Sequence, residues 1–500
     1  MARRDRRWRG AWRPIAAAAL LGLAGGAQAA PTVEGAAAPI VDGAAGATLA
    51  ALIPPGALRP YDPGRDGNAQ LVRLVTEARR RAAARPGSAA NCTGEAVSPG
   101  CLAAAAKVAA ETLAAGGVRD LVLTDVAVAE AVSGDADGAL ATLAGLEAPA
   151  AVAAALVRVA EAAVEAGDDA AARRIAWALP GAEVRVRALL AVAVRALAEG
   201  DRGGCLIAAG DALAALPAIE AAERRALLLA DIAVVEARAG RPGAAVSIVN
   251  LAFEELDTVP EEIAIARPLA RLAAALAAAG RPRAAVDTLA AVPRGPERAT
   301  ALLATVGAEA RTGRFAAAMV RTAAIPEARL RVAAFTRIAR HQAESGDRTG
   351  AQSTLALARR ALDGVVPAAW RARGLSRIAL GYAAIDAIGP ALVAARSIAD
   401  RGLRARTLWV IAARAPDAAD ALRATARAIA ARLADPVERT WLLGDLALAD
   451  ARAGETDALL AEAIATARGI AADWARARAL ARLAIVAARA ARRPLEEGRR

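Results

Sequence analysis

Two stretches of the chain break a helical pattern in the same way. Residues 236–246 read EARAGRPGAAV, and residues 277–286 read AAAGRPRAAV. In each stretch a glycine (Gly240 or Gly280) follows a long apolar run, and an alanine stands five residues after it. Glycine readily adopts the left-handed backbone conformation that ends a helix. Each stretch therefore predicts a tight turn between two helices.

The same turn recurs along the chain. Helix-ending glycines of this kind are expected at Gly134, Gly167, Gly200, Gly240, Gly280, Gly313, Gly346 and Gly454. Steps of 33, 33, 40, 40, 33 and 33 residues separate the first seven. Two degenerate units between Gly346 and Gly454 place their turns near Asp386 and near Pro416 and Asp417, where the glycine is lost. Regular spacing of this length predicts repeated helix hairpins.

Small residues flank each predicted turn. The residue seven places before the glycine is alanine in seven of eight units, and the residue five places after it is alanine in six of eight. A methyl group on each side lets the two helices approach closely. Each hairpin then has an uncovered apolar face, which the next hairpin covers. We therefore predict an all-α fold, an α-solenoid of about nine to eleven stacked helix hairpins.

The starts of the helices carry matching signals. Asp168, Asp201 and Asp347 directly follow their glycines, where an aspartate can cap the next helix. Pro242 and Pro282 stand two places after theirs, and proline suits the first helical position. First helices begin with an acidic residue or proline just before an arginine and a leucine-rich stripe, as in GPERATALL, residues 295–303.

The composition supports thin helical layers. The 500 residues are 56% hydrophobic but only 2% aromatic, and nearly a third of them are alanine. Alanine is the best helix former but adds little bulk to a core. The net charge is +12 and almost all the cations are arginine, with Lys107 the one lysine. Arginine without lysine, beside so much alanine and glycine, is typical of a GC-rich genome, so the charge by itself does not predict nucleic-acid binding.

The first 29 residues have the three parts of a secretory signal. Six arginines precede an apolar stretch from Ile15 to Leu23, and small residues end at Ala29. A disordered basic tail is the alternative. We expect cleavage after Ala29, which leaves a net charge of +7 because six arginines and one aspartate are removed. The protein is then exported, to a bacterial periplasm, and has no transmembrane segment and no nucleic-acid partner.

The rest of the chain divides by composition. We expect a flexible lead-in rich in proline, glycine and alanine over 30–67, then a short helix and a cysteine loop over 68–101. The repeat array follows over 102–492, and a basic tail over 493–500 ends the chain. Cys92 and Cys101 bracket the loop NCTGEAVSPGC, and in an oxidising compartment they are expected to form a disulfide. A metal site is the rival interpretation, but it needs about four ligands.

The repeated unit resembles the tetratricopeptide repeat family. The pattern Ala233, Gly240, Ala245 and Ala252 matches that family's unit, a helix pair with a small residue in the first helix and an alanine five after the glycine. The chain departs from it in its missing aromatic positions, irregular closing proline and steps of 33 or 40 residues. HEAT-type or another α-solenoid is the alternative. The resemblance implies a right-handed superhelix that binds protein or peptide partners.

No catalytic or cofactor motif stands out, so we expect no enzyme activity, no cofactor and no metal. The one histidine, His341, stands just before a helix end, where a cation is favoured by the helix dipole. Cys205 is expected to be a small buried residue in a helix. Four tryptophans (Trp370, Trp409, Trp441 and Trp474) fall near the expected starts of first helices. They suggest interface packing or, alternatively, an aromatic rim for a ligand.

A row of arginines is the candidate binding surface. Arginine occurs thirteen residues before several turns, at Arg187, Arg267, Arg373, Arg404 and Arg478. On the concave wall of a tetratricopeptide stack such a row could grip carboxylates or phosphates. Solvated arginines paired with nearby acids are the alternative. We therefore predict an exported, non-catalytic scaffold for protein or peptide partners, with an anionic envelope polymer or lipid as the second candidate ligand.

Overall fold

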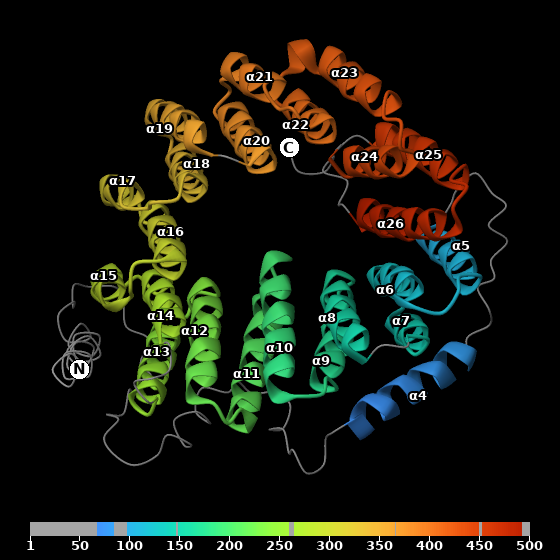
Figure 1. Cartoon of the computed structure of the whole chain (residues 1–500), viewed down its shortest axis with the longest axis horizontal. Helices are drawn as coiled ribbons and strands as arrows, with labels where there is room; N and C mark the ends of the chain where they lie inside the picture. Colours follow the sequence, from blue (N-terminus) through green and yellow to red (C-terminus); the bar gives the residue numbers. More distant parts are fainter. Residues whose placement is uncertain are drawn as a thin grey trace. The chain divides into compact units, whose positions relative to one another are not determined.

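The computed structural model describes residues 68–84, 98–146, 149–259, 265–365, 367–449 and 453–492. Within these ranges every regular element is a helix, so the predicted all-α fold is confirmed (Figure 1). The signal peptide, the lead-in, Cys92 and the basic tail lie outside the described residues. Export and the disulfide between Cys92 and Cys101 therefore stay predictions.

The helices form two compact units. The described part of unit 1 is residues 181–259 and 265–330, and unit 2 combines residues 66–180 with 331–500. The chain therefore leaves unit 2 after Pro180 and returns to it at Arg331.

Unit 1 contains four helix hairpins. Its helices are α10 (Ala182–Ala198), α11 (Arg202–Ala215), α12 (Ala222–Arg238), α13 (Pro242–Asp257), α14 (Ala266–Ala278), α15 (Pro282–Ala291), α16 (Pro296–Arg311) and α17 (Phe315–Ala323), with a 3₁₀ turn η1 (Leu216–Ala218). The two helices of each hairpin contact each other, and α10, α12, α14 and α16 also pack in series, each on the next.

Unit 2 is built from both ends of the chain. Its amino-terminal helices are α4 (Asn68–Ala84), α5 (Pro99–Glu111), α6 (Gly117–Val132), α7 (Ala136–Leu143), α8 (Pro149–Glu165) and α9 (Asp169–Trp177). Its carboxy-terminal helices are α18 (Ala328–Glu344), α19 (Arg348–Ala361), α20 (Ala368–Ala384), α21 (Ile388–Arg396), α22 (Arg401–Ala412), α23 (Ala419–Ala431), α24 (Pro436–Ala449), α25 (Ala453–Arg468) and α26 (Asp473–Arg492), with 3₁₀ turns η2 (Leu362–Gly364) and η3 (Pro416–Ala418).

The predicted turns have the predicted backbone. Seven of the eight glycines, from Gly134 to Gly346, have φ between 74° and 90° and end their helices. The amide of the residue after the glycine donates to the carbonyl five residues before it, as from Asp347 to Gln342 at 2.8 Å. This bond gives a partner to a carbonyl in the last turn of the helix. Asp386 takes the same role without glycine, at φ 61°. Gly454 is an exception, and its prediction is wrong, because it lies inside α25.

The alanines that flank the turns are buried as the spacing requires. In all seven units whose glycine ends a helix, the residue seven before and the residue five after are at most 2% exposed. The predicted caps also form. The side chains of Asp168, Asp201 and Asp347 accept bonds of 2.8–3.0 Å from backbone amides three residues on, and Pro242 and Pro282 begin α13 and α15.

The arginine at the start of each first helix fixes the loop that precedes it. Its guanidinium donates to the carbonyl six residues earlier in several hairpins. Such bonds join Arg225 to Ile219 (2.6 Å), Arg298 to Val292 (3.1 Å), Arg404 to Ile398 (3.5 Å), Arg439 to Leu433 (2.8 Å) and Arg476 to Ile470 (3.0 Å). The arginine recurs at the starts of first helices because its side chain provides a hydrogen-bond partner for a backbone carbonyl in the loop between hairpins.

Buried polar pairs cross several hairpins at a fixed spacing of twelve residues. The carboxylate of Glu309 accepts two bonds of 2.8 Å from Nε of Arg321, and Gln342 accepts a bond of 2.8 Å from Thr354. Glu130 accepts a bond of 2.6 Å from Thr142, and Lys107 donates to the same hydroxyl at 2.8 Å. Burial raises the pKa of Glu130 although Lys107 and Thr142 oppose the shift.

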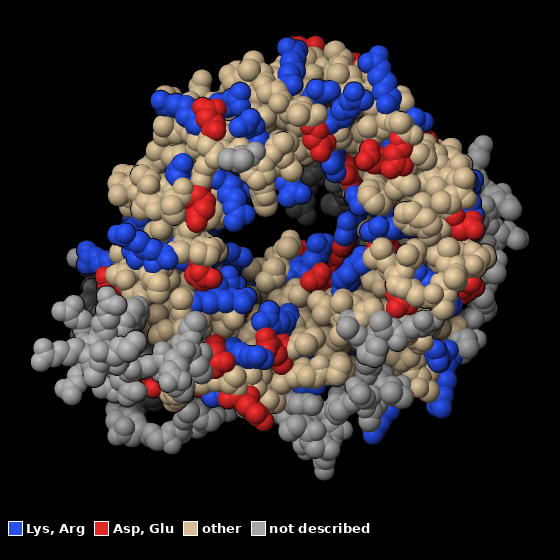
Figure 2. All heavy atoms as spheres, viewed as in Figure 1, with Lys and Arg blue, Asp and Glu red and all other residues tan. Residues whose placement is uncertain are grey.

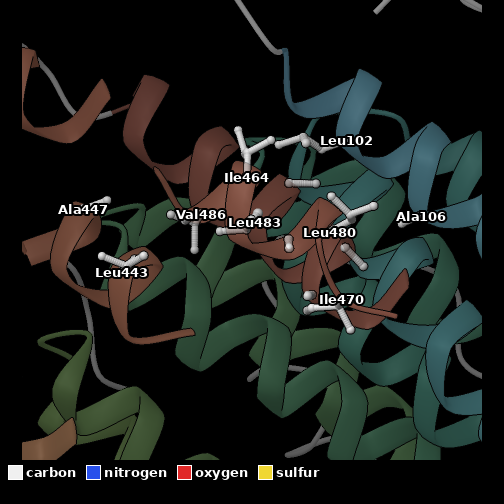
Figure 3. Packing of buried hydrophobic residues seen from close by; sticks show 14 of the residues in the cluster. Leu102, Ala106, Leu443, Ala447, Ile464, Ile470, Leu480, Leu483 and Val486 are labelled. Carbon is white, nitrogen blue, oxygen red and sulfur yellow. The ribbon is translucent and has the colours of Figure 1, made fainter. Parts of the chain in front are cut away.

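The last helix of unit 2, α26, packs on α5 and α6 near the amino-terminal end of the unit. In a linear series of hairpins the first and the last would each keep an uncovered face. Here α26 contacts both α5 and α6 as well as α24. Figure 3 shows the side chains that converge in this cluster: Leu102 and Ala106 of α5, Leu443 and Ala447 of α24, Ile464 of α25, and Leu480, Leu483 and Val486 of α26. All of them are at most 7% exposed.

Replacing a turn glycine tests the hairpin geometry. Gly280 has φ 75° and open space around it, so Gly280→Ala is strained by its backbone alone and is expected to cost about 1–2 kcal/mol of unfolding free energy. Gly243 lies inside α13, also with open space, so Gly243→Ala should be neutral or stabilising by up to about 1 kcal/mol. Chemical denaturation of the two variants measures both values. Equal effects would contradict the left-handed turn.

Shortening one side chain of α26 tests how unit 2 is built. Leu480→Ala is expected to cost about 2–5 kcal/mol and to raise amide hydrogen exchange in α5 and α6, because these helices lose a packing partner. Leu276→Ala, an equally buried position in unit 1, is the matched control and should leave α5 and α6 protected. Increased exchange confined to α24 and α25 would show that α26 does not hold the amino-terminal helices.

Candidate functional site

The five arginines of the predicted row lie in both units. Arg187 and Arg267 belong to α10 and α14 of unit 1, and Arg373, Arg404 and Arg478 belong to α20, α22 and α26 of unit 2. Arg187, Arg267 and Arg373 are exposed, whereas Arg404 and Arg478 are half-buried. Their environments differ, and the contacts of each bear on what it can bind.

In unit 1 the arginines of the row lie close to acids. Nη2 of Arg187 is 2.7 Å from Glu183, whose other oxygen is 3.1 Å from Arg224. Partial burial opposes ionisation of Glu183, but the bonds and charges of these two arginines hold its pKa below the ordinary value. Burial of Asp231 raises the pKa of this carboxyl group. The positive charge of Arg267 opposes this shift but does not outweigh it.

In unit 2 the three arginines of the row each make a different kind of contact. The guanidinium of Arg373 stacks over the indole of Trp370 at 5.2 Å, at the exposed start of α20. Arg404 bonds to the backbone of the preceding loop. Arg478 pairs with Asp125 of α6, so it ties the last helix to the amino-terminal part of unit 2. The anion-binding role of the row stays a prediction.

A network of arginines and aspartates runs across the first helices of unit 2. Asp125 accepts bonds from Arg158 at 2.7 Å and from Nε of Arg478 at 3.1 Å. On α24, Asp445 accepts from Arg482 at 2.9 Å and also from Arg406. Each carboxylate therefore bridges the helices on its two sides.

An indole joins the two halves of this network. The guanidinium groups of Arg478 and Arg482 lie over the ring of Trp441, at 5.4 and 5.1 Å from its centre. Cations in this position are attracted by the electron-rich face of the ring. The network therefore holds Trp441 and the two arginines of α26 in a fixed arrangement on the surface of unit 2.

A pocket of about 680 Å³ lies beside this network, between α22, α24 and α26. Leu433, Leu442 and Trp441 supply its apolar and aromatic surface. Its charged lining consists of four arginines and four acids: Arg401, Arg406, Arg432, Arg482, Asp400, Asp435, Glu438 and Asp445. This volume falls in the range of ligand pockets that take small molecules or a few side chains of a peptide.

Several of the lining charges already have internal roles. Arg406 and Arg482 hold Asp445, as described above. The carboxylates of Asp400 and Asp435 accept bonds of 2.8 Å from backbone amides at the starts of α22 and α24. Arg401, Arg432 and Glu438 are exposed and make no ion pair within the described part of the chain. These three side chains are therefore the ones available to a ligand.

The sequence held a signal for this network. Asp125, Arg158, Asp231, Arg271 and Asp445 each stand nine residues before a glycine in the sequence. The structure pairs such residues across adjacent hairpins, since Arg271 Nε donates to Asp231 at 2.6 Å just as Arg158 donates to Asp125. An acid in one unit and an arginine in the next, nine residues before the glycine, was thus the pattern that indicated these pairs. This position lies four residues after that of the predicted arginine row.

The tryptophans have divergent roles. Trp370 and Trp474 lie at the starts of α20 and α26, as expected, and are 40% and 46% exposed. Trp409 is buried at 2% and lies near the end of α22, so its predicted place at a helix start is wrong. Trp441 lies in the middle of α24 and lines the pocket.

The remaining singled-out residues have structural surroundings. His341 lies in the last turn of α18, as predicted, with Nδ1 2.6 Å from Glu344. Cys205 is fully buried in α11, and burial raises the pKa of its thiol to about 11. Asp135 caps α7, where its carboxylate accepts a bond of 2.9 Å from the amide of Gly138. In the described residues no helix is long and apolar enough to cross a membrane.

Comparison with known proteins shows no family for this chain. No family model matches the chain, and no curated protein matches it. Among solved structures, one of those similar to this chain is Ton1535 from Thermococcus onnurineus NA1. The match has 17% identity and a TM-score of 0.28, and it covers 63% of this chain and 95% of that chain.

A double-mutant cycle tests the contact that ties α26 to α6. Asp125→Ala and Arg478→Ala should show a coupling energy of about 1 kcal/mol, since the pair is partly buried, and added salt should reduce it. The exposed pair of Arg340 and Glu344 is the control and should couple by only about 0.3 kcal/mol. Denaturation of the single and double variants gives both energies, and a coupling near zero for Asp125 and Arg478 would remove this contact from the network.

Proposed function

We propose that this protein is a non-catalytic scaffold, exported to a bacterial periplasm, that binds peptide segments of partner proteins on its repeated helix hairpins. In this proposal the hairpins form a tetratricopeptide-like α-solenoid, and the exposed sides of the first helices carry the binding surface. The pocket beside Trp441 carries the proposal because it combines an aromatic and apolar surface with charges on both sides.

The chemistry of the lining favours a polypeptide ligand. A segment of chain offers apolar side chains for Leu433, Leu442 and Trp441, and it offers both acidic and basic groups. Arg401 and Arg432 can bind carboxylates, and Glu438 can bind a cationic side chain, all within one pocket. A purely anionic ligand would use the arginines but would be repelled by Glu438.

The fixed arrangement of the lining also supports binding. Arg406 and Arg482 are held by Asp445, and Trp441 is covered by two guanidinium groups, so these side chains lose little freedom when a ligand arrives. A surface that is already ordered binds more tightly for the same contacts.

Peptide selection tests this proposal. Random peptides are selected by phage display on the immobilised full-length chain, and their affinities are then measured by fluorescence anisotropy. Arg432→Glu should weaken the selected peptides at least about tenfold, because it reverses an available charge of the pocket.

The matched control is Arg468→Glu. Arg468 is also exposed and also stands at the end of the second helix of its hairpin, but it does not line the pocket. Its reversal should leave the affinities unchanged. Equal losses in the two variants, or selected peptides that bind both as well as the unaltered chain, would exclude this pocket as the binding site.

The second candidate, an anionic polymer or lipid as ligand, is favoured by a separate observation. Residues 331–414 contain fourteen arginines and five acidic residues, a net charge of +9, whereas the whole chain carries +12. Most of the excess positive charge therefore lies on α18 to α22 of unit 2.

A further inference from the structure

One edge of unit 2 carries a group of exposed arginines and most of the large exposed apolar side chains of this unit. Ion pairs between neighbouring first helices show where this edge lies, because the paired residues stand at nearly equal distances from the starts of their helices. Asp445 and Arg482 are each the tenth residue of their helix, and Asp125, the ninth of α6, contacts Arg158, the tenth of α8. First helices in contact therefore begin at the same side, together with the loops that join one hairpin to the next. We call this side the loop edge.

Over α19 to α22 the loop edge is basic. Arg359 and Arg360 lie near the end of α19, Arg371 and Arg373 at the start of α20, and Arg396 at the end of α21. All five are exposed. None makes an ion pair within the described residues, and Arg373 instead stacks on the exposed Trp370. In Figure 2 basic side chains outnumber acidic ones over this part of unit 2, among a mostly uncharged surface.

Over α26, α5 and α6 the same edge carries exposed apolar groups, beside the exposed acids Glu111 and Asp473. Trp474 at the start of α26 is 46% exposed, and Val118 and Leu121 at the start of α6 are 55% and 40% exposed. The loops here, 112–116 and 469–472, contain no charged residue, and their alanines are exposed. Helix α26 contacts α5 and α6, so these groups belong to neighbouring elements.

The placement is selective. Exposed apolar side chains that are scattered singly are ordinary. Of the seven large ones in the described part of unit 2, only Val410 lies toward the opposite edge; the others are Val108, Val118, Leu121, Trp370, Val393 and Trp474. Six of these seven exposed apolar groups thus lie toward the edge that carries the five exposed arginines named above.

We propose that this loop edge docks on the surface of an anionic lipid bilayer. Arginines are drawn to the negative surface potential of such a membrane, and tryptophan and aliphatic side chains enter the region of the headgroups. An acidic protein would explain the basic part of the edge but would leave Trp474, Val118 and Leu121 exposed to water. The bilayer accounts for both parts, and the docking involves no helix that crosses the membrane.

Vesicle binding by the full chain tests the proposal. Sedimentation is measured with vesicles of phosphatidylcholine containing about one third phosphatidylglycerol, and with vesicles of phosphatidylcholine alone. We expect clear binding to the first and little to the second, with affinity that falls as salt is added. Absence of binding to the anionic vesicles would overturn the proposal.

Matched variants place the contact on the loop edge. Arg396→Glu should weaken vesicle binding at least about fivefold, whereas Arg414→Glu, an exposed arginine at the opposite end of α22, should have a much smaller effect. Likewise Trp474→Ser should weaken it, and Val410→Ser should not. Circular dichroism and thermal unfolding confirm that each variant is folded. Equal losses within either pair would exclude the edge as the docking surface.

Other occupants give different results. If soluble polyglutamate binds as tightly as the anionic vesicles and does so without any contribution from Trp474, the partner is an acidic protein. If the chain forms dimers that Trp474→Ser disrupts, and anionic vesicles do not bind, the edge joins two copies. Both results contradict docking on a bilayer. The peptide affinities of Arg396→Glu should be unchanged, so failure here is separable from failure of the pocket.

Discussion

The close approach of two helices at every glycine turn is the constraint on which the rest of this structure depends. The left-handed residue reverses the chain within a few residues, and the methyl groups on either side are fully buried between the helices. A larger side chain at either position would push the helices apart. The core can therefore be built from alanine and leucine with almost no aromatic residues. Because each hairpin is thin, it cannot stand alone, and its stability comes from its neighbours.

Much of the fold could be predicted from the sequence because these requirements are local. A turn that needs φ near 80° selects glycine, and the residue that replaces glycine at position 386, an aspartate, is one of the few that tolerate this conformation. The packing of α26 on α5 and α6 could not be predicted. It joins residues more than 300 positions apart, and the apolar face of α26 looks the same whether it covers a preceding hairpin or the start of the chain. Gly454 shows the opposite failure, since a residue that fits the period lies inside a helix.

The candidate site was predicted only in part, for an electrostatic reason. The sequence shows where arginines recur, but not which of them meet an acid. Arg478 belongs to the predicted row, yet its partner Asp125 lies at the other end of the chain. The recurring arginine at helix starts is likewise bound to backbone carbonyls. What decides whether an arginine is available is therefore its neighbours in space, and in the pocket those available are Arg401 and Arg432, which no period marks.

The pocket and the loop edge are linked by the way the hairpins stack. The pocket is lined by Asp400 and Arg401 from one inter-hairpin loop and start of helix, and by Arg432, Leu433 and Asp435 from the next. Part of its lining therefore lies at the loop edge, between the basic stretch on α19 to α22 and the exposed apolar groups on α26 to α6. A bilayer docked on this edge would lie beside that part of the pocket. The two proposals then constrain each other, because a peptide long enough to extend beyond the pocket would compete with the membrane for Arg401, whereas a short one confined to Trp441 and Leu442 would not. Competition that grows with peptide length follows from this geometry, since a bilayer on the loop edge would cover Arg401, which also lines the pocket.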